Sequence, residues 1–112
     1  MAGGTFVVDF DAGAVQDLEA IKSKEERKAL LNVVDKLMNL GPRLVSPHSK
    51  PLKGEPGLFE LRPRQGNSAC RPICTRDGDN YLVLAIAKDH EKDFDGPIED
   101  ARARAAARVD NP

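Results

Sequence analysis

Hydrophobic and polar residues along this chain follow patterns that change from strand-like to helical and back again. Residues Thr5–Phe10 (TFVVDF) are rich in β-branched and aromatic side chains, which favours a strand. Between Leu30 and Leu40 the apolar residues instead recur every three or four positions, which is the spacing of one helix face. Gly41 and Pro42 follow directly and predict the end of this helix, because glycine accepts a left-handed cap and proline cannot continue a helix.

Short polar residues mark where the two N-terminal helices should begin. Asp11 is placed to cap a first helix, and Ser23 with Glu26 matches a capping box at the start of the second helix. In that motif the serine accepts from the glutamate's amide, and the glutamate side chain returns to the serine's amide. The predicted apolar face of the first helix comprises Val15, Leu18 and Ile21.

The middle of the chain predicts a loop followed by a strand. Prolines interrupt Arg43–Pro56, which we therefore interpret as a loop. Leu58–Arg62 (LFELR) alternates between the two faces of a strand. We expect one face to carry Leu58, Glu60 and Arg62 beside Arg71 of the next strand. We expect Phe59 and Leu61 on the other face, packed on the Leu30–Leu40 helix.

Two further strands are predicted after this one. A turn at Gln65–Ser68 leads into Ala69–Thr75, in which Pro72 requires an edge position or a bulge. Asp77–Asn80 is typical of a hairpin turn, and the continuous apolar run Tyr81–Ala87 is typical of a buried central strand.

A last helix completes the predicted fold. Asp95 or Gly96 can cap it, and Pro97 suits its first position. Its weak apolar stripe comprises Ile98, Ala101, Ala105 and Val109. The order of elements predicts an α+β fold: a small antiparallel sheet, two N-terminal helices packed on one face, and a C-terminal helix. The opposite face would then be free to present the basic side chains.

Composition narrows the class of protein. With 112 residues, 40% hydrophobic and 31% charged, residues 1–112 are expected to form one globular domain. No apolar run approaches the ~18 residues that a membrane span needs, and the N-terminus lacks a secretory pattern, so we expect a cytoplasmic protein. Cys70 and Cys74 are too few for a disulfide framework or a zinc site of their own, and we interpret both as thiols that pack in a strand.

Positive charge is concentrated between His48 and Arg76, although the whole chain has a formal net charge of −1. This segment holds six basic residues, namely Lys50, Lys53, Arg62, Arg64, Arg71 and Arg76, against Glu55 and Glu60. A local excess of cations in a nearly neutral protein indicates a polyanionic partner.

The same segment carries a family resemblance. Its motifs are a leucine-rich helix, the tetrapeptide PLKG, a strand ending in ELR, and a second strand that opens with R-x-I. In this order and spacing they resemble the toxins of the RelE/HigB type, in particular the phage-derived HigB-like branch. The resemblance implies a RelE-like fold and a ribosome-dependent endoribonuclease that cleaves mRNA without metal or cofactor. It also implies a cognate antitoxin, expected to be a small helix-turn-helix DNA-binding protein.

The resemblance also suggests where the catalytic residues lie. Lys53 is the lysine of PLKG, Arg62 follows the strand's glutamate, and Arg71 opens the next strand. Lys88 and His90 fall where relatives place further basic or imidazole groups. The residues expected to bind RNA besides these are Arg43, Arg64 and Arg76.

The chemistry of RNA cleavage agrees with these residue types. Attack by the 2′-hydroxyl needs a base, an acid for the leaving oxygen, and cations that stabilise a dianionic phosphorane. The fork of arginine suits the phosphorane, so we assign this role first to Arg71 and then to Arg62. Lys50 or Lys53 can serve as base or as electrostatic support. His90 is a further candidate. We interpret His48 as a turn residue and Glu60 as an ion-pair partner of Arg62.

Two other functions are compatible with the same sequence. One is a ParE-like toxin that blocks DNA gyrase by binding and cleaves no RNA. The other is a degenerate homologue that only binds an antitoxin. One fold can host unrelated activities, so fold alone does not choose between them.

Overall fold

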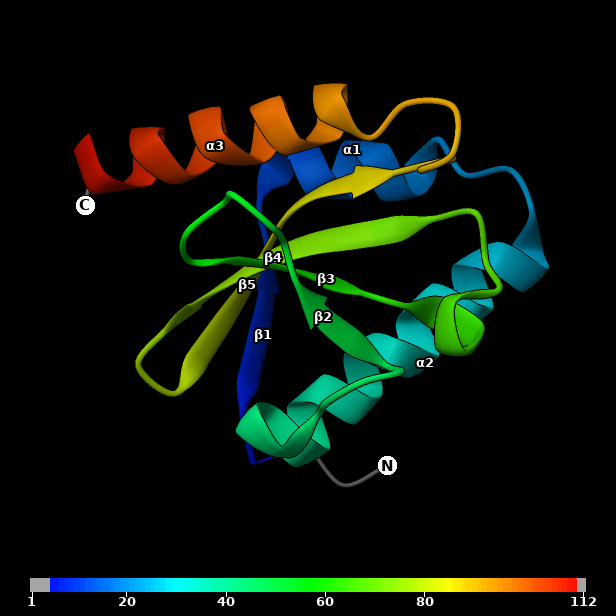
Figure 1. Ribbon diagram of the computed structural model, residues 1–112, viewed down its shortest axis with the longest axis horizontal. Coiled ribbons are helices and arrows are strands. Elements are labelled where there is room, and N and C mark those ends of the chain that lie inside the picture. The colour runs from blue at the N-terminus through cyan, green and yellow to red at the C-terminus, as the bar shows by residue number, and fades with distance from the viewer. Residues whose placement is uncertain (1–4, 111–112) are drawn as a thin grey trace.

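The computed structural model describes residues 5–110, and its centre is a five-stranded sheet in the order β1-β5-β4-β3-β2 (Figure 1). The strands are β1 (Val7–Phe10), β2 (Ser49–Pro51), β3 (Leu58–Leu61), β4 (Arg71–Asp77) and β5 (Asn80–Ala87). Neighbours are antiparallel except β1 and β5, which are parallel. The α+β class is confirmed, but the sheet is mixed rather than antiparallel, because β1 pairs in parallel with β5. Parallel neighbours need a long connection, and here the two N-terminal helices and the other three strands lie between them in the chain.

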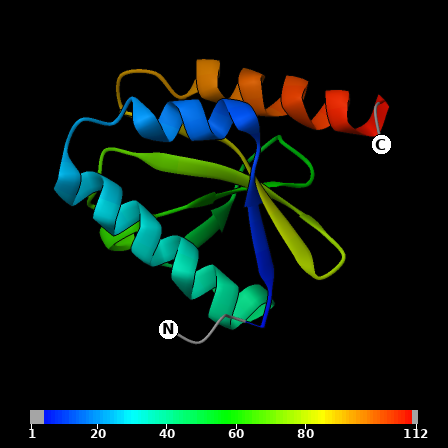
Figure 2. The ribbon, with the colours of Figure 1, turned by 180° about the vertical axis from the view of Figure 1, so that it is seen from behind.

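Helices cover both faces of the sheet. They are α1 (Ala12–Glu19), α2 (Lys24–Leu40) and α3 (Asp95–Asp110), with short 3-10 turns η1 (Gly41–Arg43) and η2 (Pro63–Gly66). Figure 2 shows α2 crossing in front of the sheet, on the side that faces away from the viewer in Figure 1. The larger core lies between this face and the two N-terminal helices, as predicted.

Helix α2 forms as the sequence predicts, with one exception at its start. The Ser23 hydroxyl accepts a hydrogen bond from the Glu26 amide at 3.2 Å, and Gly41 ends the helix with φ of 53°. The buried residues of the helix are Leu30, Val33, Val34 and Leu37. The Glu26 carboxylate, however, does not return to the serine. It accepts a hydrogen bond from Arg64 of η2 instead, at 2.8 Å, and thereby joins the helix to the turn.

The predicted apolar face of α1 is only partly right. Asp11 caps the helix by accepting from the Gly13 amide at 2.8 Å. Ala14 is the buried residue of the helix, whereas Val15 is exposed and Ile21 is buried just after the helix ends. The small side chain of Ala14 lets α1 lie close to the sheet. The next residue of a helix is turned by about 100°, so with Ala14 facing the sheet Val15 faces the solvent.

The second face of the sheet is not free, as the sequence had suggested. Ile98, Ala101 and Ala105 of α3 pack there in a smaller core, while Val109 stays exposed beyond it. The sheet contributes Leu58, Ile73, Leu84 and Ala85 to this core. Only the part of this face beside α3 is left for polar side chains.

Strands β4 and β5 form the centre of the sheet. The run 81–87 lies in β5, between β1 and β4, and is mostly buried as predicted. A bulge between Ile73 and Cys74 follows Pro72 in β4, which agrees with one of the two predicted placements of this proline. Cys70 and Cys74 are buried free thiols, as expected. The short strand β2 lies within the predicted loop 43–56, and was missed because it has only three residues, one of them proline.

Candidate functional site

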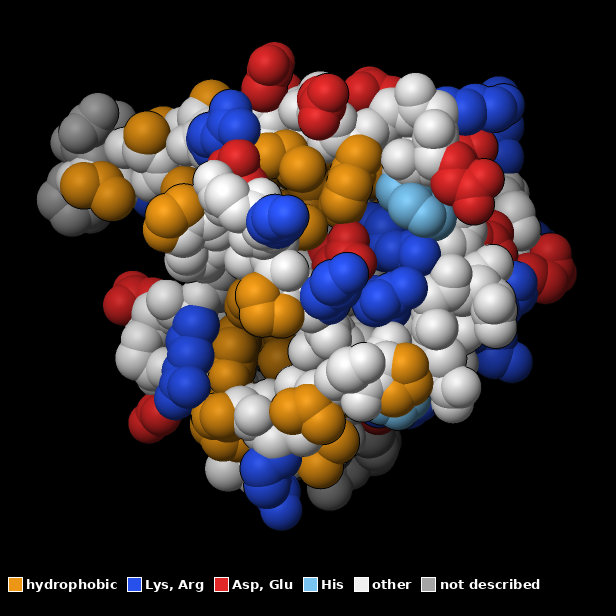
Figure 3. Space-filling view, viewed as in Figure 1, with side chains coloured by type: hydrophobic (Ala, Val, Ile, Leu, Met, Phe, Trp, Pro, Cys, Tyr) orange, Lys and Arg blue, Asp and Glu red, His pale blue; other side chains and the backbone are white. Residues whose placement is uncertain are grey.

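Glu60 lies at the centre of a cluster of cations on the sheet face beside α3. Its Oε1 atom is 3.8 Å from Nε of Arg62 and 4.0 Å from Nε of Arg71. The predicted shared face of these three residues is therefore confirmed. Figure 3 shows this region as a group of basic side chains around an acidic one, with a histidine at its upper border and apolar side chains above and below. These distances exceed hydrogen-bond lengths, so the carboxylate is flanked by the two arginines rather than tightly bound by them.

Arg71 faces inward, and its donors are used by the protein itself. Nη1 donates to the carbonyl oxygen of Ser68 at 2.5 Å, and Nη2 donates to that of Gly66 at 3.0 Å. The residue is only 3% exposed, and burial lowers the pKa of its guanidinium, against the opposing effect of Glu60. Within residues 5–110 its Nε has no hydrogen-bond partner. Arg71 therefore holds the segment that joins η2 to β4, and this places it in a supporting position.

The imidazole of His90 is held between two groups. Its Nδ1 lies 2.8 Å from the carbonyl oxygen of Ala69, which can only accept, so Nδ1 carries the proton. Its Nε2 lies 3.2 Å from Nη2 of Arg71 and accepts a hydrogen bond from it. Both ring nitrogens are thus occupied. In this arrangement His90 orients Arg71 and has no free nitrogen for proton transfer to a substrate.

Of the expected lysines, Lys50 lies on the same face of the sheet as this cluster, and Lys53 lies in the loop that follows β2. Lys50 of β2 is the register partner of Glu60 in β3, so their side chains leave the same face of the sheet. Directly opposed residues of antiparallel strands have Cβ atoms ~5 Å apart. Lys53 is exposed in the loop between β2 and β3. That loop is tied to α3 by Arg102, which donates two hydrogen bonds of 2.6 Å to the Glu55 carboxylate.

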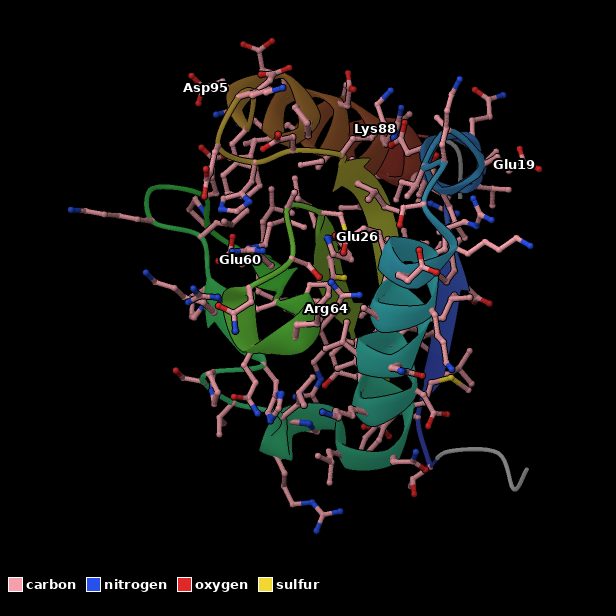
Figure 4. All side chains as sticks on the ribbon, turned by 90° about the vertical axis from the view of Figure 1, so that its right-hand side faces the viewer. Glu19, Glu26, Glu60, Arg64, Lys88 and Asp95 are labelled. Carbon is pink, nitrogen blue, oxygen red and sulfur yellow. The ribbon has the colours of Figure 1, made fainter. Side chains whose placement is uncertain are left out.

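Three predicted site residues lie elsewhere. Lys88 lines an acidic depression with Asp17 and residues of the segment 89–100, away from Glu60 (Figure 4). Arg43 is exposed at the end of η1. Arg76 lies over the ring of Tyr81, 5.7 Å from its centroid, beside the hairpin that joins β4 to β5. The sequence alone could not separate them from the cluster, because their positions depend on how the 3-10 turn η1, the β4–β5 hairpin and the segment after β5 are placed in the folded chain.

A second basic region lies between α2 and η2. It is a cleft of about 290 Å³. Its lining residues are Glu25, Lys28, Ala29, Asn32, Val33, Lys36, His48, Arg62 and Arg64. His48 thus lines a cleft rather than serving only as a turn residue. Sequence analysis missed Lys28 and Lys36, although their spacing of eight residues on an amphipathic helix places them on the same face.

The two thiols near this region are poor nucleophiles. Burial, with a smaller contribution from Glu26, raises the pKa of Cys70 to about 11. Burial also raises the pKa of Cys74. Both groups are therefore protonated at neutral pH, which agrees with a packing role.

The family of this chain is established by a match over most of its length. Residues 16–106 match the family described as phage derived protein Gp49-like (DUF891), and the chain belongs to this family. Together with the fold, this confirms the resemblance to the phage-derived branch of RelE-like proteins. None of the curated proteins that were compared matches the chain. Within residues 5–110, no helix has both the length and the hydropathy required to span a membrane.

Solved structures of toxins share the fold. The free state of a doubly substituted RelE toxin from E. coli has a TM-score of 0.62 at 17% identity, covering 93% of this chain and 97% of that chain. A toxin-antitoxin complex, RelBE2 from Mycobacterium tuberculosis, has a TM-score of 0.58 at 20% identity, covering 75% and 91%. The chromosomal ParDE system from P. aeruginosa has a TM-score of 0.57 at 15% identity, covering 72% and 92%. The chain therefore has a RelE-like fold.

Proposed function

We propose that this protein is the toxin of a toxin-antitoxin system and a ribosome-dependent endoribonuclease that cleaves mRNA without a metal or cofactor. The observation that carries the proposal is the convergence of Glu60 with Arg62, Arg71 and Lys50 on one face of the sheet. A carboxylate beside several cations combines a proton acceptor with positive charge for a phosphorane. The RelE-like fold and the basic segment support the same function.

The roles of the residues follow from their exposure. Arg62 is the cluster's accessible arginine, with 29% of its side chain exposed, and it binds the reacting phosphate. Arg71 lies in the interior beside the same carboxylate and acts as a positioning residue, and His90 holds the Arg71 guanidinium in place. This reverses the order of the two arginines expected from sequence. The guanidinium of Arg71 is buried and already donates to backbone carbonyls, whereas part of the Arg62 side chain reaches the surface.

The reaction then proceeds by transfer within the RNA. The 2′-oxygen attacks the adjacent phosphorus as the Glu60 carboxylate takes its proton, and the bond from phosphorus to the 5′-oxygen breaks. The ammonium of Lys50, across from Glu60, gives a proton to the leaving 5′-oxygen. The products are a 2′,3′-cyclic phosphate and a new 5′-hydroxyl. Lys53, exposed in the neighbouring loop, adds positive charge for the RNA backbone.

The proposed partners are the mRNA on the ribosome and a cognate antitoxin. Complexes of RelE-like toxins with their antitoxins have been solved from Mycobacterium tuberculosis and Pyrococcus horikoshii, and their toxin chains share this fold. Acidic segments in an antitoxin would favour its binding over a basic site, because the charges of the two surfaces are complementary. A small helix-turn-helix protein encoded beside this one, and a cytoplasmic location for both, belong to the same proposal.

A gyrase-blocking toxin is the second candidate. The similarity to the ParDE system favours it, and so does the inward orientation of Arg71, since a toxin that acts by binding needs no accessible catalytic arginine. In this function the cations would contact a protein or DNA surface.

The decisive experiment measures mRNA cleavage and inhibition of DNA gyrase supercoiling with the same protein preparation. Purified protein is incubated with ribosomes translating a defined mRNA, and cleavage is mapped by primer extension. Arg62→Ala should lower the cleavage rate by ~10²–10³, the scale for removing one preorganised donor. Lys22→Ala is the control, because it removes an exposed cation outside the cluster to which no role in RNA binding is assigned. Inhibition of DNA gyrase supercoiling without any mRNA cleavage would instead establish the second candidate.

A further inference from the structure

The cleft between α2 and η2 has features that packing of the fold does not require. Four cations line it, namely Lys28, Lys36, Arg62 and Arg64, against a single acid, Glu25. Arg64 is fixed by Glu26, but Lys28 and Lys36 form no ion pair with any residue in the range 5–110. Figure 4 shows Arg64 between η2 and α2, with Glu60 on the far side of η2. The cleft therefore presents uncompensated positive charge at the surface.

The turn that forms one wall of the cleft has an unfavourable backbone. Arg64 and Gln65 have φ angles of 54° and 59°, the left-handed region that residues other than glycine rarely adopt. Such conformations persist where the surroundings enforce them, and they are frequent at functional sites. Here the strained turn directs the Arg64 side chain toward α2, where it donates to Glu26 at 2.8 Å.

Arg62 connects the cleft to the cluster around Glu60. It lines the cleft, and its Nε lies 3.8 Å from the Glu60 carboxylate. A chain of anions that passes over Arg62 can therefore contact both sites. Lys28 and Lys36 are separated by eight residues of α2, about 12 Å along the helix axis, so they can contact successive groups of one extended strand.

We infer that this cleft binds the phosphodiester backbone of single-stranded RNA next to the phosphate that is cleaved. The inference rests on the proposed function and extends it to a substrate-binding site. Lys28 and Lys36 bind phosphate groups as mobile point charges, and Arg62 and Arg64 bind them as fixed forks. Asn32 and His48 supply polar groups for the ribose.

An acidic segment of a protein partner is the competing occupant. Protein interfaces depend on buried aromatic and apolar anchors, which need apolar pockets. The apolar residues that line this cleft are Ala29 and Val33, and Val33 is buried in the core, so the cleft offers little surface for such anchors. Regular backbone charge with polar contacts is the pattern of a nucleic acid instead.

The test measures RNA binding without cleavage. The probe is a fluorescein-labelled twelve-nucleotide RNA whose sugars are all 2′-O-methylated, so that no 2′-hydroxyl can attack. Its affinity for the full chain is measured by fluorescence anisotropy at several KCl concentrations. The test variant is Lys28→Ala/Lys36→Ala. The control, Lys22→Ala/Lys92→Ala, removes the same charge from exposed lysines outside the cleft. Circular dichroism verifies that both variants fold.

Loss of two phosphate contacts should weaken binding at least tenfold relative to the control, and should reduce the slope of log affinity against log salt by about 1.4, or 0.7 for each contact. Equal affinity and slope in the two variants would overturn the inference. Binding of a ten-residue polyglutamate peptide is measured in the same way. The inference would also be overturned if Lys28→Ala/Lys36→Ala lost affinity for this peptide but kept its affinity for RNA. Binding and cleavage are measured separately, so this inference and the proposed nuclease can fail separately. A chain that binds RNA through these lysines but never cleaves mRNA would refute the activity and leave the binding site standing.

Discussion

Replacing Glu60 with glutamine tests the centre of the site, because it removes one charge and almost no volume. The carboxylate has only 10% of its side chain exposed, and its Oε1 lies 3.8 and 4.0 Å from the two arginines. Glutamine would leave the guanidinium groups of Arg62 and Arg71 close together without the anion between them. We therefore expect the variant to lose both stability and activity.

The size of the stability loss can be worked from this geometry. Two unit charges 4 Å apart attract by about 4 kcal/mol at an effective dielectric constant near 20. Removing one partner of a buried ion pair typically costs about 3–5 kcal/mol. Because Arg62 is 29% exposed, water screens part of its charge. A loss of about 3 kcal/mol in the free energy of unfolding is therefore expected, at the low end of the buried-pair range.

Urea denaturation followed by circular dichroism measures this loss. The matched control is Glu55→Gln, which breaks a bidentate pair with Arg102 at the surface and should destabilise less. Cleavage of mRNA on ribosomes is measured at a temperature where both variants are folded. Loss of the base should reduce the rate of Glu60→Gln by ~10²–10⁴. If Glu60→Gln matches Glu55→Gln in both stability and rate, the carboxylate has neither the electrostatic nor the catalytic role given to it here.

Three further predictions follow from the same contacts. Arg71→Ala should lower the free energy of unfolding by about 3–5 kcal/mol, measured by urea titration, because it leaves buried carbonyls without their donor; loss of activity with unchanged stability would show that Arg71 acts on substrate instead. Arg102 lowers the pKa of Glu55, so this pair stabilises the fold above the unfolded pKa of about 4.3, and the stabilisation is lost as the pH falls below that value. Arg102→Ala should therefore flatten the acid side of the plot of unfolding free energy against pH, and an unchanged plot would contradict this. Cys70 and Cys74, whose pKa values burial raises, should resist alkylation by iodoacetamide at pH 8 until the chain is unfolded, as followed by mass spectrometry.

Local sequence rules predicted the elements whose signals are local. Helix α2 has a cap, an apolar period of a helix and a stop signal within one stretch, and it forms almost as expected. The alternation in β3 placed Glu60 and Arg62 on the same face, because side chains of a strand alternate whatever its neighbours are. These rules need no information about the rest of the chain.

The features that were missed depend on distant parts of the chain. The parallel pairing of β1 with β5 and the docking of α3 on the second face are decided by tertiary contacts. The orientation of Arg71 depends on the carbonyl groups of Ser68 and Gly66, whose directions only the folded turn defines. Sequence therefore predicted that Glu60, Arg62 and Arg71 share one face of the sheet, but not which arginine faces the solvent and which faces the interior.

The pairing of β1 with β5 has a consequence for the synthesis of the protein. Val7, near the start of the chain, takes its place beside Asn80, and Arg104 of α3 contacts Asp17 of α1 at 3.1 Å. These early and late segments must meet before the sheet is complete, and such non-local contacts make folding slow. A chain that ends at Thr75 lacks β5 and should be unfolded by circular dichroism; a folded fragment would contradict this. Until residues 80–87 have left the ribosome, the nascent chain lacks the strand that lies between β1 and β4, so the sheet that carries the basic cluster is incomplete.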